Sequence, residues 1–181
     1  MAAPRTTDRP ARLSPSDLSQ YLRTGRDPDL RRRRAVVGLS LLGLAGGQVV
    51  AAFQTGLLRR LPDPPGPFDS DRVDSSDYAY RRLQTADGLL MLVSYAVTAL
   101  LAGTGGPDRP STRPLLPLLS AGKVAVDVVT RVVLAREEWR ENRALCAYCQ
   151  AATVASVVSL PLVLPEARRS LAALRARTTS S

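Results

Sequence analysis

The sequence contains no histidine, and this absence removes several kinds of chemistry. Imidazole is the usual general base near neutral pH, and most catalytic zinc sites use it as a ligand. The chain also has only two cysteines, too few for a disulfide framework that would hold together a small secreted fold. That cysteine pair is the one evident chemical device that remains.

Aromatic residues and lysine are also scarce. Aromatics make up 4% of the chain, and alanine, leucine and valine supply most of its apolar bulk. This composition suits helices that pack in lipid better than a soluble core built around aromatic rings. Lys123 is the only lysine, so the formal charge of +9 comes almost wholly from arginine. No nucleic-acid motif accompanies these arginines, so we interpret them as charges that flank membrane spans and expect no nucleic-acid partner.

The apolar residues are gathered into runs between two polar ends. Residues 1–34 form a polar, arginine-rich N-terminal tail, and residues 166–181 form a basic C-terminal tail. The runs between them are long enough to cross a hydrocarbon core of about 30 Å at about 1.5 Å per helical residue. We therefore predict an all-α, integral membrane four-helix bundle in residues 35–165. Its predicted spans are about 35–58, 88–106, 114–135 and 144–165.

The third predicted span differs from the others because it carries Lys123, Asp127 and Arg131. A charge near the bilayer centre costs about 2.5–3.5 kcal/mol. The spacing of four residues puts all three side chains on one helix face, where Asp127 can pair with either neighbour. Two roles stay open for them, a paired structural ladder and the lining of a proton path. Residues 136–143 are predicted to form a short charged loop, and Pro161 to kink or end the last helix.

The distribution of arginine predicts the orientation in the membrane. Four spans place both tails and the loop around Arg109 on one side, which holds fifteen arginines, whereas the loops at 59–87 and 136–143 hold eight. Loops and tails rich in positive charge stay in the cytoplasm. We therefore predict a multi-pass protein of the cell membrane with both termini cytoplasmic and the cysteine pair at the extracytoplasmic face.

The cysteines Cys146 and Cys149 open the last predicted span. Positions three apart lie on the same side of a helix, so the two sulfurs can approach closely enough to bridge. The positive end of the helix favours a thiolate and is expected to lower the pKa of Cys146, although nearby glutamates oppose this effect. Such a dithiol can exchange with protein thiols or disulfides in water and with quinones in lipid. The alternatives are two small packing residues or half of a metal site; because two ligands are missing, we predict no metal.

Two segments, together with the helix order and the long loop after the first span, carry a family resemblance. One runs from Ser75-Ser76-Asp77-Tyr78-Ala79 to Gly88-Leu89-Leu90, and the other is Leu145-Cys146-Ala147-Tyr148-Cys149. In these features roughly residues 35–165 resemble the vitamin K epoxide reductase family, the membrane thiol oxidoreductases linked to quinone.

The resemblance implies roles for four residues. Cys146 and Cys149 would be catalytic, with Cys149 facing a bilayer quinone of menaquinone or ubiquinone type. Cys146 would exchange with an external thiol or a thioredoxin-like protein. Ser76 would match the family serine near the quinone, with a helix N-cap as the structural alternative. Thr153 stands where some relatives place a quinone-contacting tyrosine, and a polar contact between helices is its alternative role.

One departure from the family bears on function. Relatives usually carry a second cysteine pair in the first outer loop, whereas residues 59–87 contain no cysteine. The predicted function is that of an enzyme, a membrane thiol–disulfide oxidoreductase that couples the two cysteines to a bilayer quinone. The alternative is a non-catalytic membrane protein of the same fold that binds quinone or scaffolds a partner.

Overall fold

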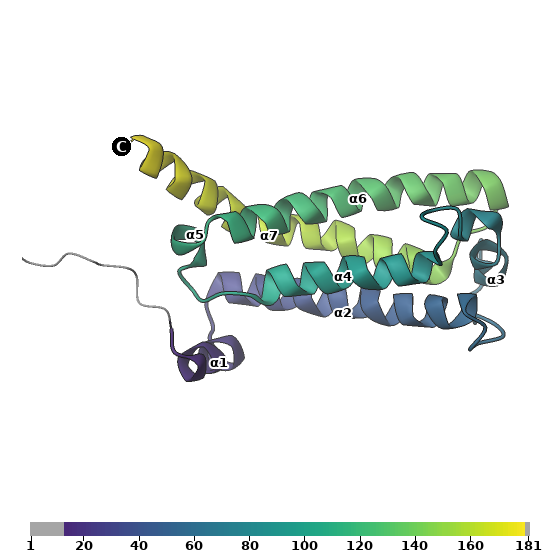
Figure 1. The fold of residues 1–181 in the computed structure, drawn as a ribbon, viewed down its shortest axis with the longest axis horizontal. Helices are drawn as coiled ribbons and strands as arrows, with labels where there is room; N and C mark the ends of the chain where they lie inside the picture. The colour runs from purple at the N-terminus through teal and green to yellow at the C-terminus, as the bar shows by residue number, and fades with distance from the viewer. Residues whose placement is uncertain (1–12, 180–181) are drawn as a thin grey trace, which may run out of the picture.

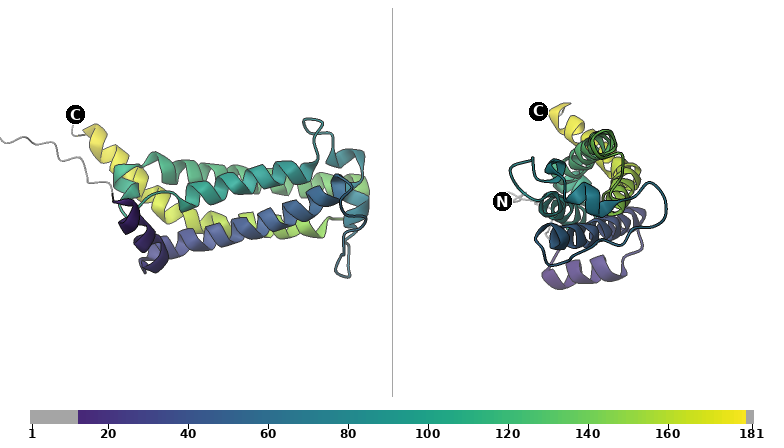
Figure 2. Two further views of the ribbon diagram at one scale, coloured as in Figure 1. Left: turned by 60° about the horizontal axis from the view of Figure 1, so that its bottom comes forward. Right: turned by 90° about the vertical axis from the view of Figure 1, so that its right-hand side faces the viewer.

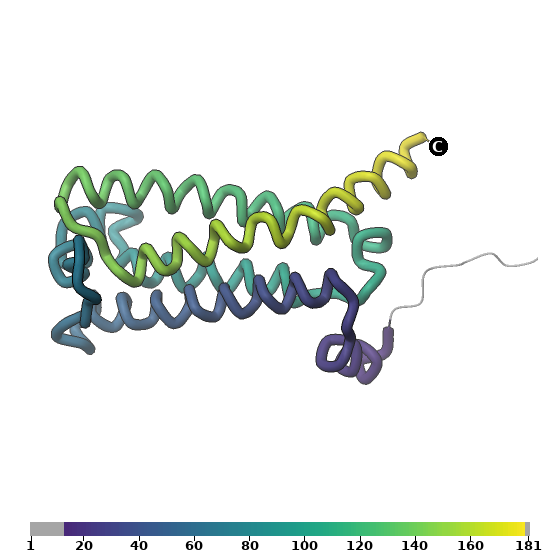
Figure 3. Tube along the Cα trace, turned by 180° about the vertical axis from the view of Figure 1, so that it is seen from behind, coloured from purple at the N-terminus to yellow at the C-terminus, as the bar shows by residue number. Residues whose placement is uncertain are grey.

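The computed structural model describes residues 13–179, which form helices with no strand among them (Figure 1). This confirms the predicted all-α class for that part of the chain. Short helices lie at the two ends of the molecule (Figures 1 and 3): α1 (Pro15–Thr24) and α5 (Arg109–Thr112) at one end, α3 (Ser70–Asp74) and the 3-10 turn η1 (Asp77–Ala79) at the other. Four long helices run side by side between them (Figure 2): α2 (Pro28–Gln54), α4 (Asp87–Gly103), α6 (Leu115–Asn142) and α7 (Ala147–Thr179).

The first two helices begin at capping residues. The Ser14 hydroxyl accepts the N–H of Asp17 at 3.2 Å and starts α1. The carboxylate of Asp27 accepts the N–H of Leu30 at 2.9 Å, and α2 begins at Pro28. The run of four arginines at 31–34 therefore lies inside α2 rather than at the end of a tail. Residues 1–12 of the predicted tail lie outside the described residues.

The charged loop predicted at 136–143 is wrong, because α6 continues to Asn142. Charged side chains do not end a helix by themselves, and this segment contains neither glycine nor proline to do so. The helix ends at Arg143, whose φ of 52° is left-handed and whose N–H donates to the carbonyl of Trp139 at 3.0 Å.

The last helix, α7, also runs further than the sequence suggested. The helix continues through Pro161 and Pro165 and ends at Thr179. Most of the predicted C-terminal tail is therefore helical, and its last turns project beyond the bundle (Figures 1 and 3). Residues 180–181 lie outside the described residues.

Two helices in residues 13–179, α2 and α7, are long and apolar enough to cross a membrane, judged by length and composition alone. The apolar helix α4 is shorter, with 17 residues. Large apolar side chains are exposed on all four long helices; examples with 61–68% exposure are Leu42, Val93, Val129 and Val154. Soluble proteins rarely expose so much apolar surface, whereas a bundle that faces lipid requires it.

Glycines bring α2 and α4 into close contact. A Cβ atom on Gly43 would lie 2.6 Å from the ring of Tyr95, and one on Gly88 would lie 2.5 Å from the backbone nitrogen of Ala51. Neither approach is possible for a larger residue without movement of the backbone or the ring. Small residues at such contacts are typical of helices that pack in lipid.

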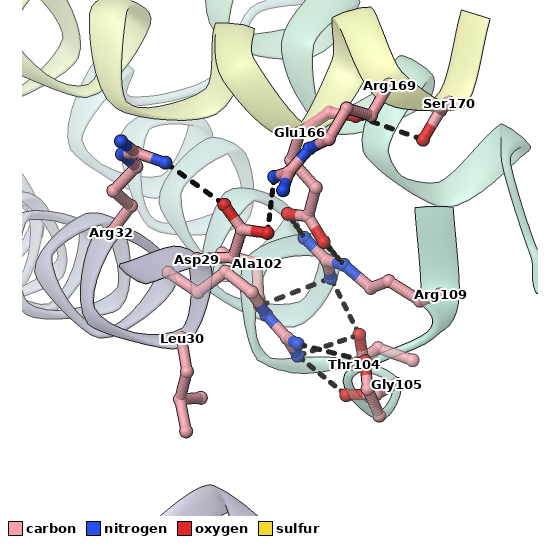
Figure 4. A network of polar contacts seen from close by, with 12 residues as sticks. Asp29, Leu30, Arg32, Ala102, Thr104, Gly105, Arg109, Glu166, Arg169 and Ser170 are labelled. Carbon is pink, nitrogen blue, oxygen red and sulfur yellow. Dashed lines mark hydrogen bonds and ion pairs between the residues drawn. The ribbon is translucent and has the colours of Figure 1, made fainter. Parts of the chain in front are cut away.

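A polar network ties the helices together at the α1 end (Figure 4). The guanidinium of Arg33 donates to carbonyls at the C-terminal end of α4, among them those of Ala102 at 2.8 Å and Gly105 at 2.8 Å. Arg109 and Glu166 form a buried two-pronged ion pair with both contacts at 2.6 Å. These bonds satisfy the free carbonyls of α4 and hold α2, α5 and α7 to it.

Candidate functional site

The two cysteines lie at the α3 end of the bundle, where the chain turns from α6 into α7. The long loop after α2 is bonded to this turn by two backbone hydrogen bonds. The N–H of Leu145 donates to the carbonyl of Pro67 at 3.0 Å, and the N–H of Asp69 donates to the carbonyl of Leu145 at 3.1 Å. The side chain of Ser70 extends the contact, because its hydroxyl accepts the N–H of Ala147 at 3.0 Å. The loop therefore covers the start of α7.

Cys146 immediately precedes α7 and is fully buried among Val50, Val73, Tyr78 and Ala144. Its sulfur accepts the N–H of Cys149 at 3.2 Å, the place that an N-cap side chain usually takes. The hydrogen bond with the Cys149 thiol and burial both raise the pKa of Cys146. Burial and the second thiol therefore outweigh the lowering of this pKa that the helix end can supply.

Cys149 differs from Cys146 in its surroundings. Both cysteines are free thiols, and their sulfurs lie within 4.8 Å of each other. Cys149, however, is only half-buried and lines a cavity of about 220 Å³. Residues from α4, α6, α7 and the covering loop surround this cavity, including Met91, Leu134 and Tyr78. The Cys146 thiol is thus buried, and Cys149 lines the cavity.

The two residues predicted to contact quinone are placed differently. Thr153 lines the cavity, and its hydroxyl donates to the carbonyl of Cys149 at 2.8 Å. Ser76 is not among the residues that line the cavity, and its hydroxyl donates to the carbonyl of Val73 at 2.6 Å. The fold therefore brings Cys146, Cys149 and Thr153 close together, whereas Ser76 lies outside the cavity lining.

Two buried acids beside the cysteines were missed from the sequence. Asp74 is 2% exposed, and a carboxylate oxygen of its side chain lies within 4.8 Å of the Cys146 sulfur. Burial raises the pKa of Asp74 to about 6. Glu138 is 3% exposed and accepts the N–H of Cys146. No sequence signal separates Asp74 from the other acids of its loop, and Glu138 stood in a segment wrongly predicted to be a loop.

Arg82 and Tyr78 fasten the covering loop over the cavity. The guanidinium of Arg82 lies 4.7 Å from the centre of the Tyr78 ring and forms ion pairs with Asp87 at 3.1 Å and Glu137 at 2.7 Å. The hydroxyl of Tyr78 donates to the carbonyl of Leu134 at 2.8 Å. The loop is therefore attached to both α4 and α6.

The charged residues of the third predicted span are paired. Lys123 contacts Asp127 at 2.5 Å and also donates to the hydroxyls of Ser94 and Thr98 on α4. Arg131 lies instead over the ring of Tyr95, 5.3 Å from its centre. The predicted pairing of Asp127 with Lys123 is confirmed. Asp127 and Arg131 also line the cavity, so a second role beside the structural one is compatible with their positions.

The ligand atoms of Asp74, Cys146 and Cys149 lie within 4.8 Å of one another. A closed structural zinc site has four protein ligands, whereas this cluster of described residues supplies three. We assign no metal to it, and the absence of a metal stays a prediction.

The fold and the site define a helical membrane protein with a buried dithiol beside an internal cavity. The chain matches the family model described as "Vitamin K epoxide reductase family" over residues 34–164, and it belongs to that family. The family consists of membrane thiol–disulfide oxidoreductases linked to quinone, so the resemblance seen in the sequence is confirmed at this level. No curated protein and no solved structure matches the chain.

Proposed function

We propose that this protein is a membrane thiol–disulfide oxidoreductase that couples the Cys146–Cys149 dithiol to a bilayer quinone of menaquinone or ubiquinone type. The observation that carries the proposal is that Cys149 lines the cavity while its sulfur lies within 4.8 Å of the sealed Cys146. A quinone bound there accepts two electrons and two protons as the dithiol becomes a disulfide.

The cavity fits the head group of a quinone. Its volume is about 220 Å³, whereas pockets for drug-sized ligands typically have about 300–1,000 Å³. The cavity therefore suits the quinone ring rather than the whole quinone molecule. Apolar side chains such as Val50 and Met91 supply contacts to the ring. The hydroxyl of Thr153 and the guanidinium of Arg131 are donors on the lining that can serve its carbonyl oxygens. The apolar tail would lie in the surrounding lipid.

Ser76 has less support as a quinone ligand. Its hydroxyl would have to leave the carbonyl of Val73, and the segment would have to shift toward the cavity. The role of Ser76 therefore stays a prediction from the family resemblance.

An external thiol or a thioredoxin-like protein is the proposed partner of Cys146. Because the loop after α2 has no cysteine to relay electrons, the partner must reach Cys146 directly. The loop must move for this to happen. The bonds that hold it include the hydroxyl of Ser70 at 3.0 Å from Ala147 N and the hydroxyl of Tyr148, which donates to Pro62 at 3.0 Å.

The proposed topology embeds all four long helices, with both termini cytoplasmic and the cysteines extracytoplasmic. The structure supports this arrangement through the placement of the short helices. The N-terminal helix α1, the α5 region and the C-terminal end of α7 lie at one end of the bundle, and the cysteine turn lies at the other (Figure 1). The arginine-rich segments thus collect at the end opposite the dithiol.

The proposal is tested by mixing purified, pre-reduced protein with quinone in detergent and measuring the quinol that forms. We expect one quinol per dithiol in the wild type and none in Cys146→Ser or Cys149→Ser. The matched control is Ala151→Ser, which adds a hydroxyl on an exposed position of the same helix and should leave the yield unchanged.

A second candidate is a non-catalytic membrane protein of the same fold that binds quinone or scaffolds a partner. The missing loop cysteines and the full burial of Cys146 favour it. Failure of every tested quinone to oxidise a folded protein with a free dithiol would select this alternative.

A further inference from the structure

We propose that Asp74 is the proton acceptor of the dithiol, and that it takes the proton of the Cys146 thiol while the disulfide forms. This inference rests on the proposed redox function and assigns a catalytic role to a residue outside the cysteine pair.

The first support is the position of the Asp74 side chain. A carboxylate oxygen of Asp74 lies within 4.8 Å of both the Cys146 and the Cys149 sulfur. Asp74 also lines the cavity that Cys149 faces. The Asp74 carboxyl group therefore lies beside the reacting thiol and also lines the cavity in which the electron acceptor would bind.

The second support is an unused oxygen. Oδ2 of Asp74 is buried and has no hydrogen-bond partner among the described residues. Leaving such an oxygen unpaired is costly, because burial removes its water without replacing it. Each such atom in a folded protein calls for an explanation, and a free carboxylate oxygen is what a proton acceptor requires.

Glu138, the other buried acid, is not available in this way. One of its oxygens accepts the N–H of Cys146, and the other accepts the side-chain amide of Gln150 at 3.1 Å. Both bonds hold the turn before α7 in place. Glu138 therefore positions Cys146, and Asp74 is the acid that is free to take a proton.

The charged and titratable groups around Asp74 keep its proton affinity near the physiological range. Asp63 accepts hydrogen bonds from Ser70, and Asp87 is paired with Arg82; the negative charges of both carboxylates raise the pKa of Asp74. Burial is the largest cause of its raised pKa of about 6, and acidic neighbours add to it. Nine charged or titratable groups face Asp74, and they come from the loop after α2, from α4, from α6 and from the start of α7. They are Asp63, Asp71, Tyr78, Arg82, Asp87, Arg131, Glu138, Cys146 and Cys149.

The proposed step is balanced in protons and electrons. The reduced pair holds two S–H bonds, and one S–S bond replaces them. The Cys146 proton passes to the Asp74 carboxylate, the Cys149 proton leaves into the cavity, and two electrons go to the oxidant. Asp74 then releases its proton into the cavity and returns to the carboxylate form. The oxidant, a quinone under the proposed function, takes up two electrons and two protons in total.

The test measures how fast pre-reduced protein in detergent forms the disulfide with diamide, a two-electron thiol oxidant that needs no quinone. In the wild type we expect the rate to fall as the pH drops through about 6, where Asp74 becomes protonated. In Asp74→Asn we expect a rate about a hundredfold lower at pH 7, the lower end of the range for a positioned base, with only the pH dependence that the loss of thiolate itself causes. Asp77→Asn is the control, since it removes an exposed carboxylate three residues along the chain.

A thiol titration by alkylation and mass spectrometry separates this role from a general electrostatic one. Removing the carboxylate should make Cys146 ionise at lower pH, because Asp74 raises the pKa of Cys146. Slower oxidation together with a more acidic Cys146 thiol is the result expected for a lost proton acceptor. An Asp74→Asn protein that oxidises as fast as the wild type, or faster, would overturn the proposal.

Two further outcomes keep the test decisive. If Asp74→Asn does not fold, the wild-type profile alone answers the question, and a flat diamide rate from pH 5 to 7 would refute the role of Asp74. If the wild type reduces no quinone but its diamide rate keeps the Asp74-dependent fall, the proposed quinone function fails and the role of Asp74 stands.

Discussion

The two ends of the bundle handle buried charge in opposite ways. At the α1 end, Arg109 and Glu166 are almost fully buried, and each prong of their pair measures 2.6 Å. At the α3 end, Asp74 is equally buried, yet one of its oxygens has no partner among the described residues. Complete pairing makes a rigid joint between helices, whereas incomplete pairing leaves a group whose protonation can change. The difference separates the structural end of the molecule from its chemical end.

The largest expected effect comes from breaking the paired end. Glu166→Gln leaves the Arg109 charge buried without its counter-charge, and we expect a loss of about 3–5 kcal/mol in the free energy of unfolding. Denaturation in detergent, followed by circular dichroism, measures it. The control is Glu141→Gln, which breaks the exposed pair with Arg81 and should leave the stability almost unchanged, because water screens this pair. Equal stability of the two variants would show that the buried pair is not a structural joint.

The next effect concerns the unpaired end and its dependence on pH. The pKa of Asp74 is raised from 3.8 to about 6 in the folded protein, so the folded state holds this proton more tightly than the unfolded chain. The favourable contribution of the protonated acid is complete below pH 3.8 and is lost as the pH rises through about 6. At 1.36 kcal/mol per pKa unit the loss is about 3 kcal/mol.

Asp74→Asn should reduce the pH dependence by the part that Asp74 contributes and be no less stable than the wild type at pH 7. Unfolding in detergent at a series of pH values from 4 to 7 measures this, with Asp77→Asn as the control of equal charge. A variant that keeps the wild-type slope would place the titrating group elsewhere.

The smallest expected effect tests the cover over Cys146. Ser70→Ala removes the hydroxyl that accepts the N–H of Ala147, a bond worth about 1 kcal/mol. Because 1.4 kcal/mol is a factor of ten, we expect alkylation of Cys146 to become about fivefold faster as the loop opens more often. The exposed Ser75→Ala in the same loop is the control. Unchanged alkylation of Cys146 would mean that Ser70 does not hold the loop closed.

Much of the local structure was predictable because its causes are local. The spacing of Cys146 and Cys149 on one helix face, the cap at Ser14, and the close approach permitted by Gly43 each depend on a few neighbouring residues. The error at 136–143 has a local cause as well, since a charged stretch was taken for a loop although nothing in it ends a helix. A charged stretch marks where a helix leaves the lipid, but the helix itself can continue beyond that point, as α6 does.

The sequence by itself determined the helical class, the family and the identity of the two thiols, since these follow from apolar runs and from motifs that are contiguous in the chain. The tertiary structure decided which thiol is sealed, which one meets the cavity, and which acid of the loop stands beside them. Asp74 lies in a loop whose residues 67–70 pair with the start of α7, and Ser70 and Ala147 of this contact are 77 positions apart in the chain. Burial changes the proton affinity of a carboxyl group, and burial is a property of contacts between distant segments that no local pattern contains.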